Sequence, residues 1–113
     1  MLKPVHIYYP VRKLIRTWPA EVKGELGTVL MRLQRNEFVG MPDVRAMPSV
    51  GRGGFEVRIK ASRGAFRAFY VSIDAHGIAV FHAFQMKTQQ TGQKEIETGT
   101  VRLRAFMAEL GGG

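Results

Sequence analysis

The stretch FEVRIKASRGAFRAFYVSIDAHGIAVFHAFQM, residues 55–86, holds three apolar runs separated by two short polar segments. In the first run, every second residue from Phe55 to Ile59 is apolar and the residues between are charged, which is the period of a half-buried strand. The separating segments, SRG (62–64) and DAHG (74–77), have the length and the turn residues of hairpin connections. The sequence therefore predicts a three-stranded antiparallel meander.

The part of the chain before the meander has helical periodicity. A short strand is predicted at VHIYY (5–9), where β-rich residues are flanked by prolines. Apolar residues recur at helical spacing over 11–18 and again, on one face, over 20–35, where Thr17 can cap the second helix. The connection at 36–54 is dense in glycine and proline and shows no sustained period.

Helical spacing returns between Gly92 and Leu110, with Thr91 in a position to cap the helix. The predicted order is β-α-α-β-β-β-α, in which helices and strands are segregated. This order favours an α+β domain with helices against one face of the sheet: an antiparallel meander carries two N-terminal helices and a C-terminal helix. We expect a single domain over residues 1–110 and a disordered C-terminal tail at 111–113.

Composition restricts the classes of function. The chain has 113 residues, and 45% of them are hydrophobic, which is enough to bury a core. Its net charge of +8 attracts polyanions, acidic proteins or anionic surfaces at long range. The absence of cysteine excludes a disulfide scaffold and a thiolate metal site. No signal peptide and no apolar span of about 20 residues is recognisable, so we expect a cytoplasmic protein without a membrane partner.

Positive charge is concentrated in the predicted strands. Between Gly51 and Arg67 the chain carries five basic residues and a single acid, Glu56. The basic residues are Arg52, Arg58, Lys60, Arg63 and Arg67. The planar fork of an arginine can hold two phosphate oxygens at once. The pattern indicates a phosphate-binding surface, although basic residues that merely solvate an exposed sheet face would produce the same pattern.

The position of Arg67 is ambiguous in this pattern. Alternation places Arg58 and Lys60 on the face opposite the apolar residues of their strand, and a hairpin brings Arg67 back beside them. Strict alternation, however, groups Arg67 with Phe69 and Val71, which look core-facing. Either Arg67 lies at the strand margin or a bulge intervenes.

Three segments in this order resemble the RelE/HigB toxins: GRGGFEVRI (51–59), AFRAFYV (65–71) and HAFQMKTQQTGQKEIETG (82–99). The pattern is similar to that of the phage-derived branch of the RelE/ParE superfamily. Members of that branch typically read G-x-x-E-[LV]-R, then Y/F-R-x-x-Y, then H-x-F-x-K-K-T-x-x-T-P-x-x-[ED]-I. The resemblance covers roughly residues 10–109 and implies a small sheet with two N-terminal helices and a C-terminal helix.

The resemblance implies the toxin of a type II toxin–antitoxin pair. Such a toxin is a metal-independent endoribonuclease that cuts mRNA, generally in the ribosomal A site, and is silenced by a cognate antitoxin. We therefore expect mRNA, the ribosome and an antitoxin as partners, and no metal or small-molecule cofactor. Two alternatives stay open: a ParE-like toxin that inhibits gyrase, and a catalytically inactive phage relative that binds RNA through its basic face.

The resemblance also assigns individual residues. Arg58 matches the arginine of E-[LV]-R, Arg67 that of the Y-R motif, and Lys87 the second lysine of K-K-T. The chain departs from the family pattern at Met86, where a lysine is usual, and at Gly92, where proline is usual. The first departure removes a cation near the proposed site.

These residues are expected to have different roles in the cleavage reaction. Arg58 and Arg67 are expected to clamp the scissile phosphate and stabilise the transition state, and Lys87 to assist or to protonate the leaving group. His82 is the fourth predicted catalytic residue and one of several candidates for the general base. The other candidates are Glu56, Lys60 and Tyr70, and the residues expected to bind RNA are Lys60, Arg63 and Arg52. Structural alternatives are a core or edge position for His82 and, for Glu56, a cross-strand ion pair that orients Arg58 or Arg67.

Overall fold

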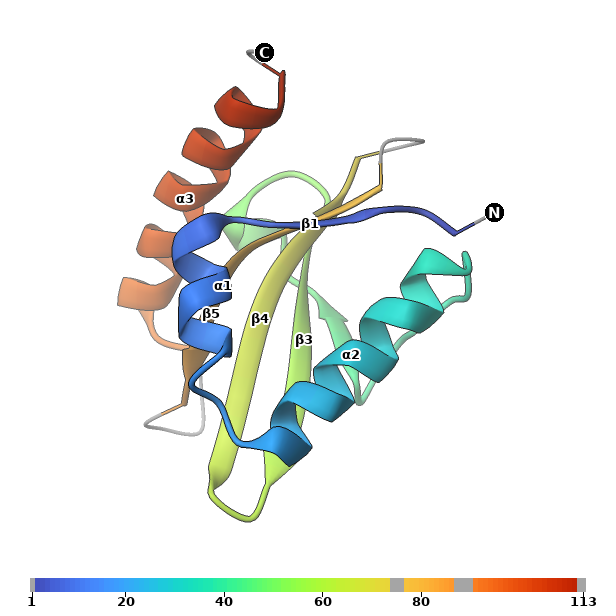
Figure 1. Cartoon of the computed structure of the whole chain (residues 1–113). Coiled ribbons are helices and arrows are strands. Elements are labelled where there is room, and N and C mark those ends of the chain that lie inside the picture. The colour runs from blue at the N-terminus through green and yellow to red at the C-terminus, as the bar shows by residue number, and fades with distance from the viewer. Residues whose placement is uncertain (1, 74–76, 87–90, 112–113) are drawn as a thin grey trace.

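The computed structural model describes residues 2–73, 77–86 and 91–111. Its elements are β1 (Val5–Ile7), α1 (Tyr9–Ile15), α2 (Ala20–Gln34), β2 (Val44–Ala46), the 3-10 helix η1 (Pro48–Val50), β3 (Gly54–Ala61), β4 (Gly64–Ser72), β5 (Ile78–Gln85) and α3 (Gln93–Gly111). The strands form one sheet in the order β1-β5-β4-β3-β2, in which β1 is parallel to β5 and the other neighbours are antiparallel. The predicted α+β fold, with its meander and three helices, is confirmed (Figure 1).

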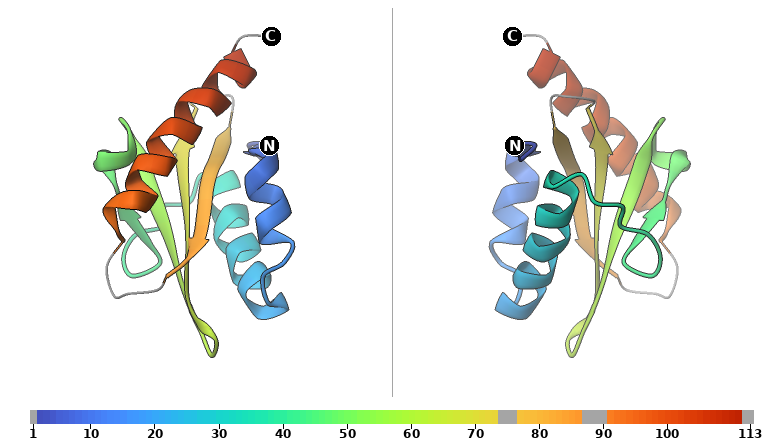
Figure 2. Two further views of the ribbon diagram at one scale, coloured as in Figure 1. Left: turned by 90° about the vertical axis from the view of Figure 1, so that its left-hand side faces the viewer. Right: turned by 90° about the vertical axis from the view of Figure 1, so that its right-hand side faces the viewer.

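The helices cover both faces of the sheet. Figure 2 shows α1 and α2 on one side and α3 on the other, so the expectation that all helices lie against one face is wrong for α3. The reason is that β4 is apolar on both sides. Phe66 and Tyr70 pack in the core under α1 and α2, whereas Phe69 and Val71 pack in a second core under α3.

Helix α2 packs on the sheet through the first of these two cores. Its inward face is formed by Val22, Leu26, Val29 and Leu30, all of them buried. This is the apolar stripe of an amphipathic helix, and burying each side chain stabilises the fold by roughly 1.5–3 kcal/mol. Trp18, in the turn before α2, completes this core by packing on Phe66, with ring centroids 5.0 Å apart. The prediction of a helix over 20–35 is therefore confirmed to within one residue.

Three local predictions differ from the structure. Helix α1 begins at Tyr9, so β1 is shorter than predicted; Pro10 sits in the first turn of α1, where its missing N–H costs nothing. Thr17 does not cap α2, because its hydroxyl donates to the carbonyl of Leu14 at 2.6 Å. Strand β2 lies within the segment that was predicted to be a connection. Three residues are too few for alternation to be recognised.

Helix α3 lies close against the second core at Gly99, which is buried. A Cβ at this position would lie 2.8 Å from Cδ2 of Phe69. Phe69 is fully buried and packs against Phe81 and Phe84, so its ring has little room to move. The absence of a side chain at Gly99 therefore permits α3 to lie on the sheet.

Gly99→Ala is expected to lower the free energy of unfolding by about 1–3 kcal/mol, because overpacking outweighs the gain in helix propensity of about 1 kcal/mol. Gly24→Ala on α2 is the matched control: a methyl group at Gly24 would have no neighbouring atom within 4 Å, so this substitution should stabilise the protein. Urea unfolding followed by circular dichroism measures both. Equal stabilisation by the two substitutions would contradict the close approach of α3.

Helix α3 continues to Gly111, one residue into the segment predicted as a tail, and residues 112–113 lie outside the described part of the chain. The boundary of the predicted domain at residue 110 stays a prediction. Within the described residues, no helix has the length and apolar character needed to cross a membrane.

Candidate functional site

The strand register brings the two predicted arginines together. Arg58 of β3 pairs directly with Arg67 of β4, so both side chains leave the sheet on the same face. This is the face of α3, since the pair two residues further along the strands, which lies on the same face, joins Glu56 to Phe69, a member of the core under that helix. Arg67 lies within β4, and the register irregularity falls beyond it, between Phe69 and Tyr70. Neither a marginal position nor a bulge before Phe69 is needed, because the α3 face is itself partly apolar.

A single carboxylate lies among the cations. Glu56 is fully buried, and its Oε1 lies 3.1 Å from Nη2 of Arg45 and 3.8 Å from Nε of Arg58. Its Oε2 lies 3.8 Å from Nε of Arg67 and accepts a 2.6 Å hydrogen bond from the hydroxyl of Thr91. Oε1 accepts no hydrogen bond of good geometry within the described residues, so its contact with Arg45 is mainly Coulombic. The ion pairs that the structural alternative for Glu56 requires, with Arg58 and with Arg67, are present.

The arginine cluster, defined as Arg45, Arg58 and Arg67, carries more positive charge than Glu56 can balance. Burial lowers the pKa of Arg67; Glu56 opposes this effect, and Arg58 and Arg45 reinforce it. A guanidinium nevertheless stays protonated in proteins. Nη1 of Arg67 also donates to the carbonyl of Phe66 at 3.1 Å, which holds its side chain in place. Because three cations face one carboxylate, an added anion would relieve their mutual repulsion.

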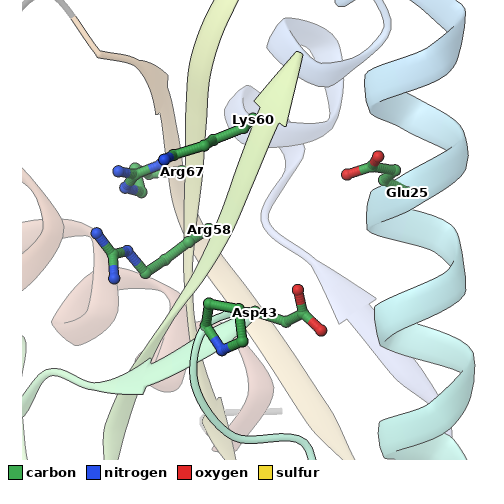
Figure 3. A pocket seen from close by; sticks show the side chains of 6 residues that line it. Glu25, Asp43, Arg58, Lys60 and Arg67 are labelled. Atoms are coloured by element: carbon green, nitrogen blue, oxygen red, sulfur yellow. The ribbon is translucent and has the colours of Figure 1, made fainter.

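A hollow opens beside this cluster, where β2 no longer covers β3. Strand β2 pairs with β3 only over Phe55–Val57, and the hollow of about 340 Å³ adjoins the next residues. Its lining residues are Glu25, Pro42, Asp43, Arg58, Lys60 and Arg67. Figure 3 shows the cationic ends of Arg58, Lys60 and Arg67 gathered on one side of the strand, while the carboxylates of Glu25 and Asp43 lie on its other side. An anion approaching from the cationic side therefore meets three positive groups.

Arg52 and Arg63, which were also predicted to bind RNA, do not line this hollow. Arg52 precedes β3 and Arg63 follows it, so the two lie near opposite ends of a strand that spans roughly 26 Å at 3.3 Å per residue. Both are exposed. Lys87 lies outside the described residues, and its role stays a prediction. Of the predicted site residues in the described part of the chain, the hollow brings together Arg58, Arg67 and Lys60.

His82 is buried under α3 and is not among the residues that line the hollow. Its Nε2 lies 2.8 Å from Oε1 of Glu95, and its Nδ1 lies 3.2 Å from Nη1 of Arg102. A guanidinium can only donate, so Nδ1 accepts and the ring proton sits on Nε2, which donates to Glu95. With both nitrogens engaged, His82 has no free position for the predicted role of general base. The structure supports the alternative of a core residue, one that holds α3 on the sheet.

Acid is expected to destabilise the protein through His82. Burial lowers the pKa of His82, an effect that the hydrogen bond to Glu95 opposes and Arg102 reinforces. The unfolded chain therefore takes up the proton first, near pH 6.5, and the free energy of unfolding falls as pH drops below that value, by at most about 1.4 kcal/mol per pH unit. The loss stops once the folded state is also protonated.

Urea unfolding between pH 7.5 and pH 5 measures this dependence. His82→Gln should remove this contribution to the pH dependence, whereas the control His6→Gln should retain it. If His82→Gln shows the same pH dependence as the wild type, the buried neutral imidazole is not its source.

Tyr70, another candidate base, lies on the opposite face of the sheet. It belongs to the core under α1 and α2 and stacks on Phe55, with ring centroids 5.3 Å apart. Burial raises the pKa of Tyr70 to about 12. Tyr70 therefore neither reaches the arginine cluster nor ionises readily. Among the four candidates for the base, Lys60 is the one whose side chain lines the hollow.

Comparison with known proteins identifies the family of the chain. Residues 13–104 match the family described as Phage derived protein Gp49-like (DUF891). The chain belongs to the Gp49-like family. The matched segment of this Gp49-like protein includes the hollow and the whole arginine cluster. The resemblance to phage-derived RelE-type proteins is thereby confirmed at the level of the family.

This Gp49-like protein is similar to solved structures of the E. coli toxin RelE. A mutant of the E. coli toxin RelE in the free state is 17% identical, with a TM-score of 0.54, over 91% of this chain and 98% of that chain. The isolated E. coli RelE toxin is 18% identical, with a TM-score of 0.48, over 80% and 89% of the two chains. A search of curated proteins found no match. The first likeness, at this low identity, establishes a shared fold.

Sequence reasoning missed two residues of the site. Arg45 lies in β2, where the alternation of Val44, Arg45 and Ala46 is too short to stand out from a loop. Thr91 was expected to cap a helix, but its hydroxyl donates to Glu56. Within residues 2–73, 77–86 and 91–111, no three side chains of histidine, cysteine, aspartate or glutamate are grouped so that they could hold a metal ion.

Proposed function

We propose that this Gp49-like protein is the toxin of a type II toxin–antitoxin system, acting in the cytoplasm as an endoribonuclease that cuts mRNA on the ribosome. The observation that carries the proposal is the pairing of Arg58 with Arg67 across β3 and β4, next to Lys60 at an open hollow. A net charge of +8 supports a polyanionic substrate. The shared fold with a protein named as a toxin, E. coli RelE, supports the toxin assignment.

The proposed reaction is the attack of a ribose 2′-OH on the adjacent phosphorus. Arg58 and Arg67 bind the non-bridging oxygens and stabilise the charge that develops on the pentacoordinate phosphorus. Lys60 is the candidate proton acceptor that reaches the hollow, and it takes the proton of the 2′-OH when its amine is in the neutral form rather than the resting ammonium form. The bond from phosphorus to the 5′-oxygen breaks, Lys87 gives that oxygen a proton, and the products are a 2′,3′-cyclic phosphate and a free 5′-OH. This route needs no metal or other cofactor.

The same charge distribution fits the proposed antitoxin. An acidic or amphipathic segment that covers the arginine cluster would neutralise its excess charge, and electrostatic attraction would speed association. The product of the adjacent reading frame is the protein to test for binding and neutralisation.

Addition of the purified protein to a translating extract tests the proposed activity. We expect translation to stop and the mRNA to be shortened, with cleavage ends mapped by primer extension. Intact mRNA together with inhibited gyrase supercoiling would instead support a ParE-like toxin. RNA that is bound in a salt-dependent manner but stays whole would support a catalytically inactive relative.

A further inference from the structure

The arginine cluster is graded in exposure across three adjacent strands. The side chain of Arg67 on β4 is 5% exposed, that of Arg58 on β3 is 28% exposed, and that of Arg45 on β2 is 43% exposed. Arg45 is the direct partner of Glu56 in the pairing of β2 with β3, so the side chains of Arg45 and Glu56 lie on the same face of the sheet. The three cations thus form a row on the α3 face that runs from the interior to the surface.

Within the described part of the chain, most of the hydrogen-bonding capacity of the Arg45 side chain is unused. A guanidinium carries five N–H donors in a planar fork. Among the described residues, the one polar contact of the Arg45 side chain is the ion pair with Oε1 of Glu56, and that contact lacks the geometry of a hydrogen bond. No described residue therefore occupies the donors of Arg45, which lies at the exposed end of the row.

We propose that Arg45 is a phosphate-binding residue of the RNA site. It binds a second phosphate of the RNA strand, different from the phosphate that Arg58 and Arg67 hold. Glu56 is the positioning residue that aims the three guanidiniums. The inference rests on the proposed function and deepens it, because it gives the RNA strand a path across β4, β3 and β2. Strands lie roughly 4.8 Å apart, so β2 and β4 are separated by roughly 10 Å, which gives Arg45 and Arg67 room to engage different phosphates.

This position predicts a particular effect on kinetics. A phosphate away from the reacting bond carries the same charge in the ground state and in the transition state. Its contact with Arg45 therefore contributes uniform binding, and the loss of Arg45 raises KM while kcat stays unchanged. A residue that acted only by supporting Glu56 would lower kcat through the misplacement of Arg58 and Arg67.

The test measures the binding of a dye-labelled single-stranded RNA whose 2′-OH groups are methylated, so that it cannot be cleaved. Arg45→Ala should bind about tenfold more weakly, and the slope of log K against log salt should decrease in magnitude by about 0.7, the value for one phosphate contact on a single strand. Arg45→Lys should keep the slope but bind more weakly than the wild type, because the fork is lost. Arg12→Ala on α1 removes the same charge at an exposed position on the other face of the sheet and should keep the wild-type slope.

The outcomes separate this inference from the proposed function. A wild-type protein that neither binds nor cuts RNA would overturn both. Wild-type cleavage together with a wild-type salt slope in Arg45→Ala would overturn the inference alone, as would a fall in kcat with an unchanged slope. If thermal unfolding shows that Arg45→Ala is not folded at the assay temperature, Arg45→Lys decides the question. If Arg45→Lys then binds the RNA with the affinity of the wild type, the proposal is overturned.

Discussion

Glu56→Ala is expected to lower the free energy of unfolding by about 3–5 kcal/mol, the range observed when one partner of a buried ion pair is removed. The substitution would leave Arg45, Arg58 and Arg67 close together without their shared counter-charge, and Arg67 is almost completely buried. It would also deprive the hydroxyl of Thr91 of its acceptor. Urea unfolding at neutral pH measures the loss.

Glu25→Ala is the matched control for this prediction. Glu25 is also an acid at the hollow, but it is exposed and lies on α2, so its removal should change the free energy of unfolding by no more than about 0.5 kcal/mol. Glu56→Gln keeps the shape of the side chain and one acceptor oxygen, so it should be less destabilised than Glu56→Ala. Equal stability of Glu56→Ala and Glu25→Ala would show that the carboxylate does not hold the arginines in place.

Arg58→Ala is expected to reduce kcat for mRNA cleavage by about 10²–10³-fold, the usual effect of removing one group that stabilises charge in a transition state. The fold should tolerate this change better than the loss of Glu56. Arg58 is partly exposed, and Glu56 keeps its contacts with Arg45 and Arg67. Cleavage rates in a translating extract measure the effect, and thermal unfolding confirms that the variant is folded.

The control for Arg58→Ala is again Arg12→Ala, which lowers the net charge by the same amount at a position far from the hollow in the fold. Arg58→Lys should retain part of the rate, since it keeps the charge but loses the fork. If Arg58→Ala cuts mRNA as fast as the wild type, Arg58 has no part in the reaction, and the transition state must be stabilised by other residues.

The fold was predictable where the periodicity was long. Alternation from Phe55 to Ile59 and the helical stripe of α2 each repeat often enough to define an element. The side on which α3 packs was not predictable in this way. It depends on β4 burying residues on both faces, and the apolar run AFRAFYV does not say which of its residues meets which helix. Strand β2 was missed because three residues carry no period.

The candidate site was predictable only where its residues are close together in the sequence. Arg58 and Arg67 are joined by a short hairpin, so their pairing follows from local geometry. Contacts between residues far apart in the sequence do not follow from local geometry. Thr91 contacts Glu56 across 35 residues, and Arg102 contacts His82 across 20 residues. The contacts of His82 with Glu95 and Arg102 on α3 favour a structural residue over the predicted general base. The role of Lys87 stays a prediction.

The uncovered edge of β3 has a consequence for solubility. The outermost strands, β1 and β2, are each three residues long, so most of the sheet's length would be open to pairing with another chain unless something protected it. Natural proteins discourage such edge-to-edge growth with charged side chains, lysine above all. Lys60 lies where β2 has ended and β3 continues. The same ammonium group that lines the hollow therefore also opposes aggregation of the protein at this edge.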